Sequence, residues 1–485
     1  MSTIQDVESA AITPMLEELN TALESAIIPG DINKLIERCS LNLSTSIILK
    51  GDSKRLLANI KRMLLSDESE NILDYELLLE LLQSLIDVSS FDDVLEVFST
   101  NDLLDALNSG ITSIVRAACK IISKSYPKGI FASSLIIDIV LEIFFNLDTE
   151  ISIINDIETL FKNLSSDELI RRRILVNNHP LLKKIKRDFE PKSFTRLIEL
   201  LKIEYEFITP SEFDESLFVI TINEIRKSIE KDIFIFISIT NYYTSLVANI
   251  DAIGIHGTNH MWVISSIEST VYFYGDLFAN LETYFEVKNF GLSYMFELFR
   301  QCSYQKNGEL FHTIDKAYVK LSHDTPYILE FMAFVNPKYL FKFHQTLVHD
   351  FALVTPSRLG ILRNIMADPD CFLLIEPKIT SGNILALPYM EQMVLLEKMT
   401  QFKYGVEYLI QFLPQVMANL TQNLNGEVTE PETVELRREA VEHLLQFGEP
   451  VLNVWYNPLR KLYGRIVNGD NYEKKVEPKL ASAYL

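Results

Sequence analysis

The chain has 485 residues, of which 48% are hydrophobic and 11% aromatic, so it can bury a large core, and this composition argues against global disorder. Its net charge of −21 argues against broad binding to a nucleic-acid backbone, which needs clustered Lys and Arg, and suits a basic protein partner. Gly (16) and Pro (17) are few while Leu and Ile dominate, which favours helices over a strand-and-turn fold.

The cysteines and the first residues of the chain indicate a compartment. The four cysteines are widely separated and include no Cys-x-x-Cys pair, which indicates buried thiols in a reducing compartment rather than a zinc site or disulfides. The N-terminus carries acids where a signal peptide carries bases, and the run from Ile233 to Ile239 is far shorter than the ~18 residues of a membrane helix. We therefore expect a cytoplasmic protein, with the nucleus as a further location, and no membrane contact.

Short polar breaks divide the first third of the chain into helices. These are predicted at residues 4–24, 31–49, 53–65, 72–87, 91–98, 103–107, 111–122, 131–147 and 150–163. Two similar segments, FSTNDLL and VNNHPLL, place Leu103 and Leu181 78 residues apart, which is two periods of 39. HEAT and armadillo repeats run about 40–47 residues, so the echo favours a repeat array.

The stretch from Ser165 to Thr209 is predicted to hold three helices separated by two breaks. Ser165 and Glu168 fit a capping box at the first helix, Pro180 ends that helix, and Pro191 marks the next break. The last helix carries an apolar stripe of Phe194, Leu197, Ile198, Leu201, Tyr205 and Ile208. Its other side carries a polar stripe of Lys192, Arg196, Glu199, Lys202 and Glu206. Such a unit needs neighbours of the same kind to cover its apolar side.

The rest of the chain continues the helical pattern. Residues 222–250 contain a β-branched run that fits a buried strand or a buried helix, and we favour the helix because no partner strand is evident nearby. Residues 258–325 are the least regular. Further helices are predicted at 336–350, 356–366, 387–400, 404–423, 434–447 and 451–467, and a polar loop at 422–433. Without any linker, we expect one solenoid over residues 1–485, with a helical array at 4–467 and a loose tail at 468–485.

Motifs of catalysis and of cofactor binding are absent from the sequence. It contains no G-x-x-x-x-G-K-[ST], G-x-G-x-x-G, G-x-S-x-G or H-E-x-x-H. His256 and His260 have the spacing of a metal pair, but the glycines around them indicate ordinary loop histidines. The pair His349-Asp350 has no evident nucleophile. We therefore expect no enzymatic activity, no cofactor and no metal.

Two charged stretches have both a structural and a functional interpretation. Arg171, Arg172 and Arg173 fit a phosphate or acidic partner, but three consecutive residues fan around a helix, so we favour pairing of at least one with an acid of a neighbouring repeat. The polar stripe described above fits a solvated helix face with internal ion pairs. It fits equally a partner groove, because one helix of each solenoid repeat lines the inner curve.

Six segments carry a family resemblance. They are FDDVLEVFSTNDLLDAL (91–107), ACKIISKSYPKGIF (118–131), SSDELIRRRILVNN (165–178), LRNIMADPDCF (362–372), LPYMEQM (387–393) and VWYNPLRKLYGRIVNGDNY (454–472). Together they resemble the yeast HEAT-repeat chaperone family of proteasome base assembly, which is also named for spontaneous mutability and DNA mismatch repair. The resemblance implies an all-α HEAT/armadillo-type solenoid of about eleven repeats in an open C shape, without enzymatic activity or cofactor.

The resemblance also implies a function and a partner. The family assists assembly of the base of the 26S proteasome regulatory particle and is absent from the mature proteasome. It holds the C-terminal helical domain of one AAA ATPase, subunit one of the base, in its concave face, alongside the neighbouring base subunits. A scaffold in DNA mismatch repair is the alternative. We expect a monomer that makes no direct contact with nucleic acid.

Partner-binding residues are expected on the inner face of the repeats. From the polar stripe these are Arg196, Glu199 and Lys202. Candidates in other repeats are Asn241, Tyr242, Arg363, Asn364, Asp92, Asp93 and Glu96. Asp92, Asp93 and Glu96 form a carboxylate cluster at helical spacing, which would present a negative field to an approaching domain.

Overall fold

The computed structural model describes residues 2–25, 28–43, 53–65, 72–250, 260–422 and 430–469, with side chains from residue 12 onward except those of 306 and 307. Within these ranges the chain is helical and contains no strand, and its fold class is an all-α, HEAT/armadillo-type solenoid. Two compact units make up the chain, Met1–Thr270 and Val271–Leu485. The predicted single solenoid, its C shape and its eleven repeats concern the whole chain and stay predictions.

The first unit consists of paired helices. Its helices are α1 (Ser2–Glu24), α2 (Ile32–Asn42), α3 (Ser53–Leu64), α4 (Tyr75–Val88), α5 (Phe91–Val97), α6 (Thr100–Asn108), α7 (Thr112–Ser123), α8 (Ile136–Phe145), α9 (Ile151–Leu164), α10 (Glu168–Arg172), α11 (His179–Asp188), α12 (Pro191–Tyr205), α13 (Glu215–Phe218), α14 (Ile222–Lys231) and α15 (Ile233–Ala248). Helix α16 (Ile264–Ala279) spans the boundary between the units. The helices predicted at 53–65, 72–87, 91–98, 111–122 and 150–163 are confirmed to within a few residues.

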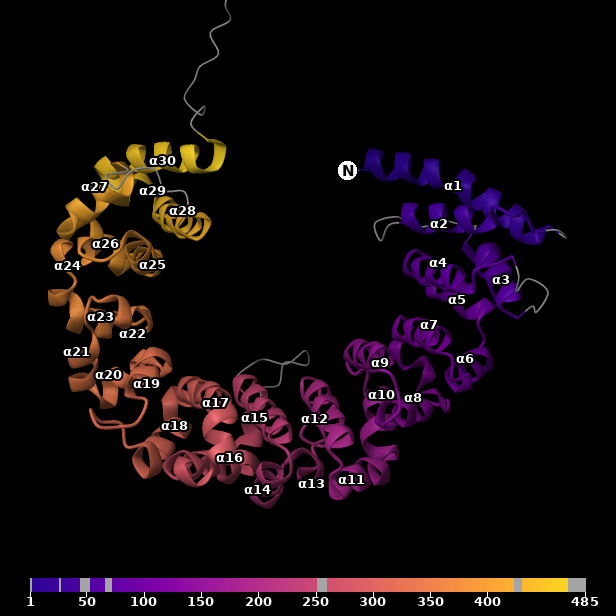
Figure 1. Ribbon diagram of the computed structural model, residues 1–485, viewed down its shortest axis with the longest axis horizontal. Coiled ribbons are helices and arrows are strands. Elements are labelled where there is room, and N and C mark those ends of the chain that lie inside the picture. The colour runs from indigo at the N-terminus through magenta and orange to yellow at the C-terminus, as the bar shows by residue number, and fades with distance from the viewer. Residues whose placement is uncertain are drawn as a thin grey trace, which may run out of the picture. The chain divides into compact units, whose positions relative to one another are not determined.

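Two rows of helices run through the first unit. Helices α2, α4, α7, α9, α12 and α15 contact one another in succession and lie on the inner side of the unit's curve (Figure 1). We call them the inner row. Helices α3, α5, α6, α8, α10, α11 and α13 form the outer row behind them (Figure 1). The helices of the two rows bury their apolar stripes against one another. The core of the unit therefore lies between the inner and the outer row.

Hydrogen bonds between neighbouring repeats have a regular separation along the first unit. Asn59 donates to Asn20, 39 residues earlier, at 2.9 Å, and Ser165 donates to Glu204, 39 residues later, at 2.6 Å. Arg116 and Asp156 stand 40 residues apart and 2.7 Å from each other. These separations agree with the period of 39 that the sequence echo indicates.

Around residue 165 the structure corrects the predicted helix start. Asp167, not Ser165, caps α10, and its carboxylate accepts from the backbone N–H groups of Leu169 and Ile170. The Ser165 hydroxyl points into the core, so the predicted capping box is wrong. The helical stretch continues as a π-helix, Arg173–Asn177, and ends at Asn178, so the predicted end of this helix just before Pro180 is confirmed. Pro180 lies in the first turn of α11, where its missing N–H breaks no bond.

The predicted arginine pairing and the buried helix are both confirmed. Arg171 lies 3.1 Å from Glu212, 41 residues later, and Arg173 pairs with Asp138 of the preceding repeat. Residues 222–250 form α14 and α15 instead of a strand. Asp232 separates the two helices and caps α15 through the N–H of Phe234.

The corner between α11 and α12 has an unusual backbone. Phe189, which ends α11, has φ 55° and ψ 39°, a left-handed conformation that glycine usually occupies. Its side chain is buried, with its ring centroid 4.3 Å from that of Phe194. The Lys227 ammonium lies 4.4 Å above the Phe189 ring. Packing therefore holds this residue in the left-handed conformation.

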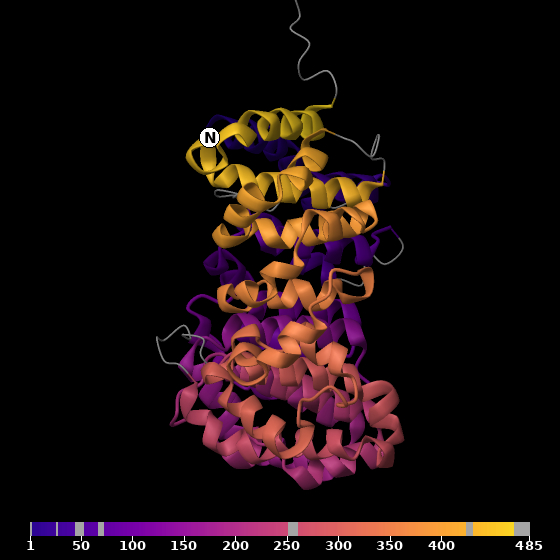
Figure 2. The same ribbon diagram turned by 90° about the vertical axis from the view of Figure 1, so that its left-hand side faces the viewer.

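The second unit continues the arrangement with shorter helices. These are α17 (Leu292–Tyr304), α18 (Glu309–Ile314), α19 (Ile328–Phe334), α20 (Pro337–Phe343), α21 (Gln345–Phe351), α22 (Leu359–Ile365), α23 (Pro369–Ile375), α24 (Ser381–Leu385), α25 (Tyr389–Thr400), α26 (Lys403–Phe412), α27 (Pro414–Gln422), α28 (Pro431–Gln446), α29 (Gly448–Leu452) and α30 (Tyr456–Asn468). Helices α17, α19, α22, α25 and α28 contact one another in succession. Figure 2 shows the helices of this unit stacked in layers.

Several predicted helices of the second unit are divided. The stretch 336–350 breaks at His344, and 404–423 breaks at Leu413, because a helix does not readily continue through the residue before Pro414. The irregular stretch 258–325 is mostly helical where it is described and includes two π-helices, Val287–Gly291 and Asp315–Val319. His256, most of the predicted loop 422–433 and most of the predicted tail lie outside the described residues.

Aromatic side chains form the centre of the second unit. The ring of Phe331 lies between 5.2 and 6.4 Å, centroid to centroid, from five other phenylalanine rings. These belong to Phe278, Phe296, Phe299, Phe311 and Phe334. Because aromatic rings bury large areas, this cluster supplies much of the unit's core.

Candidate partner-binding surface

A surface of mixed charge lies on α9 and α12 of the inner row. It consists of Glu158, Lys162, Arg196, Glu199 and Lys202, and we call it the α9–α12 charge cluster. Lys202 lies 3.6 Å from Glu199, and both side chains are more than a third exposed. Burial and the neighbouring Glu199 carboxylate raise the pKa of Glu158, although the three cations lower it in part. The cluster is therefore partly accessible and places two carboxylates among three cations.

Arg196 also has a structural role, because it hydrogen-bonds to the end of a neighbouring helix. Its Nη1 donates to the carbonyl oxygens of Phe144 and Asn146 at 2.8 and 2.7 Å. These carbonyls lie at the C-terminal end of α8, where the helix leaves its last carbonyls without internal partners. Arg196 thus ties α12 to the preceding repeat, and only part of its side chain is available to a partner.

Of the two candidates on α15, one is unavailable. Asn241 is half-buried at the surface of the helix. Tyr242 is fully buried, and its hydroxyl donates to the Phe218 carbonyl at 2.8 Å, so the prediction that it contacts a partner is wrong. The sequence carried a signal for this, because Ile239, Tyr242 and Leu246 continue an apolar stripe at helical spacing.

The two candidates on α22 lie in the second unit. Arg363 is about half exposed and its Nη2 lies 3.3 Å from Oε2 of Glu397 on α25. Asn364 donates to the carbonyl oxygens of Met332 and Val335 at 3.0 and 2.7 Å. Asn364 therefore satisfies the end of α19, as Arg196 satisfies the end of α8.

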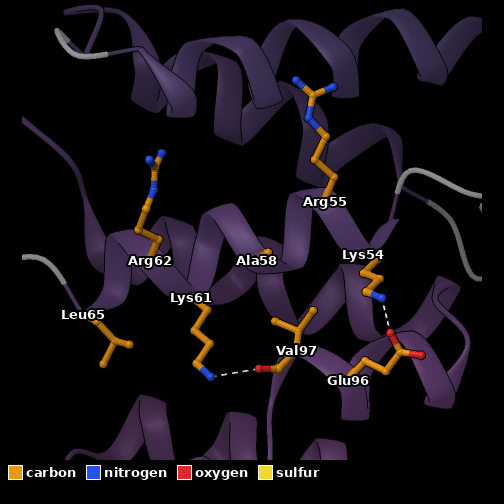
Figure 3. Close-up of a pocket in the computed structure, with 8 residues that line it drawn as sticks. All are labelled: Lys54, Arg55, Ala58, Lys61, Arg62, Leu65, Glu96 and Val97. Carbon is orange, nitrogen blue, oxygen red and sulfur yellow. Dashed lines mark hydrogen bonds and ion pairs between the residues drawn. The ribbon is translucent and has the colours of Figure 1, made fainter.

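The carboxylate cluster on α5 lies in the outer row of the first unit. Asp92 and Glu96 are exposed, whereas the Asp93 carboxylate accepts from the Ser90 hydroxyl at 2.7 Å, at the start of α5. Helix α5 packs on α3, and Glu96 pairs with Lys54 of that helix (Figure 3). The structure therefore does not bring this cluster together with the α9–α12 charge cluster.

Sequence reasoning missed the basic face of α3, whose signal is two Lys-Arg pairs seven residues apart, at 54–55 and 61–62. Figure 3 shows these side chains around an open pocket between α3 and the end of α5. Arg55 pairs with Glu17 and Glu24, each at 2.7 Å. The hydrogen bond from Arg55 lowers the pKa of Glu24 to about 2.

The remaining cations of this pocket are also engaged. Lys61 donates to the Val97 carbonyl at 2.8 Å (Figure 3). It also donates to Asp102 at 2.6 Å. Arg62 donates to the Leu23 carbonyl at 2.6 Å. Because each cation of the pocket has a partner within the chain, the basic face of α3 joins the first repeats to one another and offers little to an anion.

Histidines of the second unit contact two aspartates, Asp315, which is buried, and Asp350, which is exposed. His344 Nε2 lies 2.6 Å from Oδ2 of Asp315, which also accepts from the Tyr339 hydroxyl at 2.7 Å. His349 and His323 both lie 3.0 Å from carboxylate oxygens of Asp350. Among the described residues, none of these histidines hydrogen-bonds a serine or cysteine that could serve as a nucleophile.

Metal-binding clusters and membrane-spanning helices are both absent from the described ranges. In those parts of the chain, no group of three or more His, Cys, Asp or Glu could hold a metal ion. No described helix is long and apolar enough to span a membrane. The fold itself, a helical solenoid, is typical of non-catalytic scaffold proteins.

Comparison with known proteins decides the family. The family described as "DNA mismatch repair protein HSM3, N terminal domain" matches residues 13–248, and its C-terminal counterpart matches residues 260–485. The chain is 39% identical over 483 residues to "DNA mismatch repair protein HSM3" of Saccharomyces cerevisiae, which covers 99% of both chains. The chain belongs to the HSM3 family. The resemblance seen in the six sequence segments is thereby confirmed.

Other HSM3 relatives and several solved structures are also similar. The protein of the same name from Eremothecium gossypii is 39% identical over 440 residues, covering 91% of this chain and 92% of its own. Solved structures from studies of cadherin with beta-catenin and of SYS-1 with POP-1 have TM-scores of 0.35 and 0.36. Their identities are 13% and 11%, and they cover 95% and 96% of this chain and 91% and 92% of their own. Similarity this low carries no argument about function.

Proposed function

We propose that this HSM3 family member is a chaperone for assembly of the base of the 26S proteasome regulatory particle. It would hold the C-terminal helical domain of the AAA ATPase subunit one on the inner row, beside neighbouring base subunits, and leave before the proteasome is mature. The proposal rests on the family resemblance and, within the structure, on the α9–α12 charge cluster. It includes a monomer without catalytic activity, in the cytoplasm and also in the nucleus.

The charge cluster suits a protein domain with basic side chains. Burial is the main cause of the raised pKa of Glu158, and repulsion from the Glu199 carboxylate adds to it, while Lys162, Lys202 and Arg196 lower it. A Lys or Arg of a partner placed between these carboxylates would relieve this repulsion and become desolvated, which favours binding and orientation. A chain with a net charge of −21 would also speed the approach of a basic domain.

The decisive experiment measures binding of the purified chain to the purified C-terminal domain of the ATPase subunit. We expect Glu158→Gln with Glu199→Gln to weaken binding by about tenfold, because two charge contacts at the interface are lost. The matched control is Asp92→Asn with Glu96→Gln, which removes the same charge from the outer row and should change affinity by less than about twofold. The association rate should fall as salt rises, since salt screens long-range attraction.

Hydrogen exchange with and without the ATPase domain provides an independent map. Protection should appear on α9, α12 and α15. If protection were confined to the outer row, or if only the control variant weakened binding, the inner-row assignment would be wrong. No binding of the domain at all would count against the chaperone proposal itself.

A scaffold in DNA mismatch repair is the second candidate, because the relatives carry that name. Affinity isolation of the tagged chain from cell extract separates the two. Recovery of base ATPases without core-particle subunits supports the chaperone. Recovery of mismatch-repair ATPases without base ATPases supports the scaffold and would overturn the first proposal.

A further inference from the structure

A second basic surface follows α10 and α11 in the outer row of the first unit, and the proposed function does not use it. Two adjoining depressions run along these helices and share Asp214. One side is lined by Arg171, Arg172, His179, Lys183, Lys184, Lys186 and Arg187. The other side comes from residues 211–216, which lead into α13. We call the two depressions together the α10–α13 groove.

Two ion pairs join the sides of the groove. Arg171 is 2% exposed, and its Nε donates to the Glu212 carboxylate at 3.1 Å while its Nη1 donates to the Ser165 carbonyl at 2.9 Å. His179 Nε2 lies 2.6 Å from Oδ2 of Asp214. Burial raises the pKa of Asp214, but hydrogen bonds from Ser216 and His179 outweigh it and bring the pKa to about 2.

A buried lysine adds a third connection. The Lys186 ammonium donates to the carbonyl oxygens of Ser216, Leu217 and Val219 at 2.8, 3.2 and 2.7 Å. These carbonyls lie at and beyond the end of α13, and burial lowers the pKa of Lys186. With three such connections, the two sides of the groove are fixed before any ligand arrives, which lowers the entropic cost of binding.

Four other cations at the groove are weakly neutralised. Arg172 and Lys184 are exposed and make no ion pair within the part of the chain that the structure describes. Lys183 lies 3.7 Å from Asp214, and the Arg187 side chain is 78% exposed with Asp188 at 3.7 Å. The cations on α3 differ, because each has a close partner there. In a chain with a net charge of −21, the α10–α13 groove thus presents local positive charge.

We propose that the α10–α13 groove binds an acidic peptide segment of a protein partner. The weakly neutralised cations lie on one side together with a single acid, Glu168, whereas Glu215 and Glu224 line the other side. These two acids would repel a continuous phosphate backbone but not a peptide whose acids face α11. Val176, 57% exposed at the end of the π-helix, offers an apolar contact within the groove. Helix α11, with 10 residues, extends roughly 15 Å, which matches about five residues of extended peptide, so a ten-residue peptide can follow it and reach the depression beside α10.

The test uses the purified full chain and a dye-labelled ten-residue peptide rich in Asp and Glu, followed by fluorescence anisotropy. The same peptide with Asn and Gln in place of the acids, and a short duplex DNA of equal dye content, are the other probes. We expect the acidic peptide to bind and the neutral peptide not to bind. Arg172→Glu with Lys184→Glu should weaken binding by about tenfold or more, because two attractions become repulsions.

The matched control is Lys34→Glu with Arg38→Glu on α2, where both side chains are exposed. It changes the net charge by the same amount and should alter peptide affinity by less than about twofold. Equal weakening by both double variants would mean that only the overall field matters and would overturn the site. Absence of acidic-peptide binding, or tighter binding of DNA than of peptide, would overturn the proposal as well.

Two further measurements test whether weaker peptide binding comes from the lost positive charge and not from unfolding. Arg172→Ala with Lys184→Ala removes the charges without adding repulsion, and should weaken peptide binding by a smaller factor in the same direction. Circular dichroism melting curves confirm that each variant is folded. Since no ATPase domain enters this assay, its result is independent of whether the inner row binds that domain.

Discussion

The two units join successive helices by different chemistry. In the first unit, charged side chains reach the carbonyls at helix ends: Lys124 donates to Ile86 at 3.1 Å and Lys231 donates to Phe189 at 2.6 Å. In the second, neutral side chains often do so: Tyr404 donates to Met366 at 2.7 Å and Tyr408 to Glu376 at 2.9 Å. Both meet the same requirement, because the last carbonyls of every helix need donors.

The two units also differ in how their cores are packed, but they overlap in how many residues separate the two partners of a bond between repeats. The cluster around Phe331 consists of phenylalanine rings, whereas in the first unit Phe144 lies 5.6 Å from Phe161 and Phe213 contacts both Phe218 and Trp262. Bonds between repeats span 33 to 41 residues at Lys120, Ser165 and Arg171 of the first unit, and 29 to 38 residues at Tyr408 and Tyr404 of the second, so the two ranges overlap. Short helices with aromatic packing and longer helices with ionic connections are thus two ways to pack successive helices, and the two units should respond differently to perturbation.

The largest expected effect is in the aromatic core. Phe331→Ala should lower the free energy of unfolding of the second unit by about 4 kcal/mol, since it removes a fully buried ring and its contacts to five others. Phe161→Ala in the first unit is the matched variant and should cost less. Each unit has its own buried thiols, Cys39 and Cys119 in the first and Cys302 and Cys371 in the second, so thiol labelling in urea measures them separately.

That comparison fails if both variants expose all four thiols at the same urea concentration. Such a result would mean that the units unfold as one cooperative body. The difference in chemistry would then not translate into separate stabilities.

The next effect concerns pH. Burial raises the pKa of Glu204 in the first unit to about 8, although the Ser165 hydrogen bond lowers it in part. The folded unit therefore favours the protonated acid. This stabilisation is complete below the ordinary pKa of 4.5 and is lost as the pH rises through about 8. We expect a loss of about 3 kcal/mol between pH 5 and pH 8, measured by urea unfolding, and Glu204→Gln should abolish it.

Asp315 gives the second unit the opposite dependence. Burial raises the pKa of this carboxyl, but hydrogen bonds from His344, Leu321 and Tyr339 outweigh it and lower the pKa. Its stabilisation is present above the ordinary pKa of 3.8 and is lost in acid. If the stability of the first unit depended on pH in the Glu204→Gln variant as it does in the unchanged chain, a group other than Glu204 would control that dependence.

The smallest effect separates charged from neutral connections. Lys124→Met and Tyr408→Phe each remove donors to helix-end carbonyls and should each cost about 1 kcal/mol. The cost of Lys124→Met should shrink in 1 M salt, because Lys124 also pairs with Asp87 at 2.7 Å. The cost of Tyr408→Phe should not. Equal salt dependence of the two variants would contradict the proposed distinction between the units.

The helices could be predicted from the sequence, but the hydrogen bonds that polar side chains make to the ends of other helices could not. Apolar residues at helical spacing and the breaks at proline gave the boundaries of α4, α9 and α12 to within a few residues. Arg196 and Asn364 look like free surface groups in the sequence. Each instead donates to a helix end about 30 to 50 residues earlier, and no local pattern reveals such an acceptor.

The same limit explains the capping error and the missed groove. Ser165 and Asp167 are both good capping residues, and only the buried Glu204, 39 residues later, decides that Ser165 turns inward. The α10–α13 groove forms because residues 211–216 lie against α11, which the spacing of its lysines does not reveal. Tyr242 is different, since its apolar stripe was visible and the residue could have been excluded.

Phe189 restricts which sequences the corner between α11 and α12 accepts. Glycine there would remove about 1 kcal/mol of left-handed backbone strain but would lose about 3 kcal/mol or more of buried ring packing. Leucine would keep part of the packing and all of the strain, and asparagine would ease the backbone while burying an amide without a partner. Substitutions that a helix end normally tolerates are therefore each unfavourable at this position, and an engineered variant of the first unit should leave it unchanged.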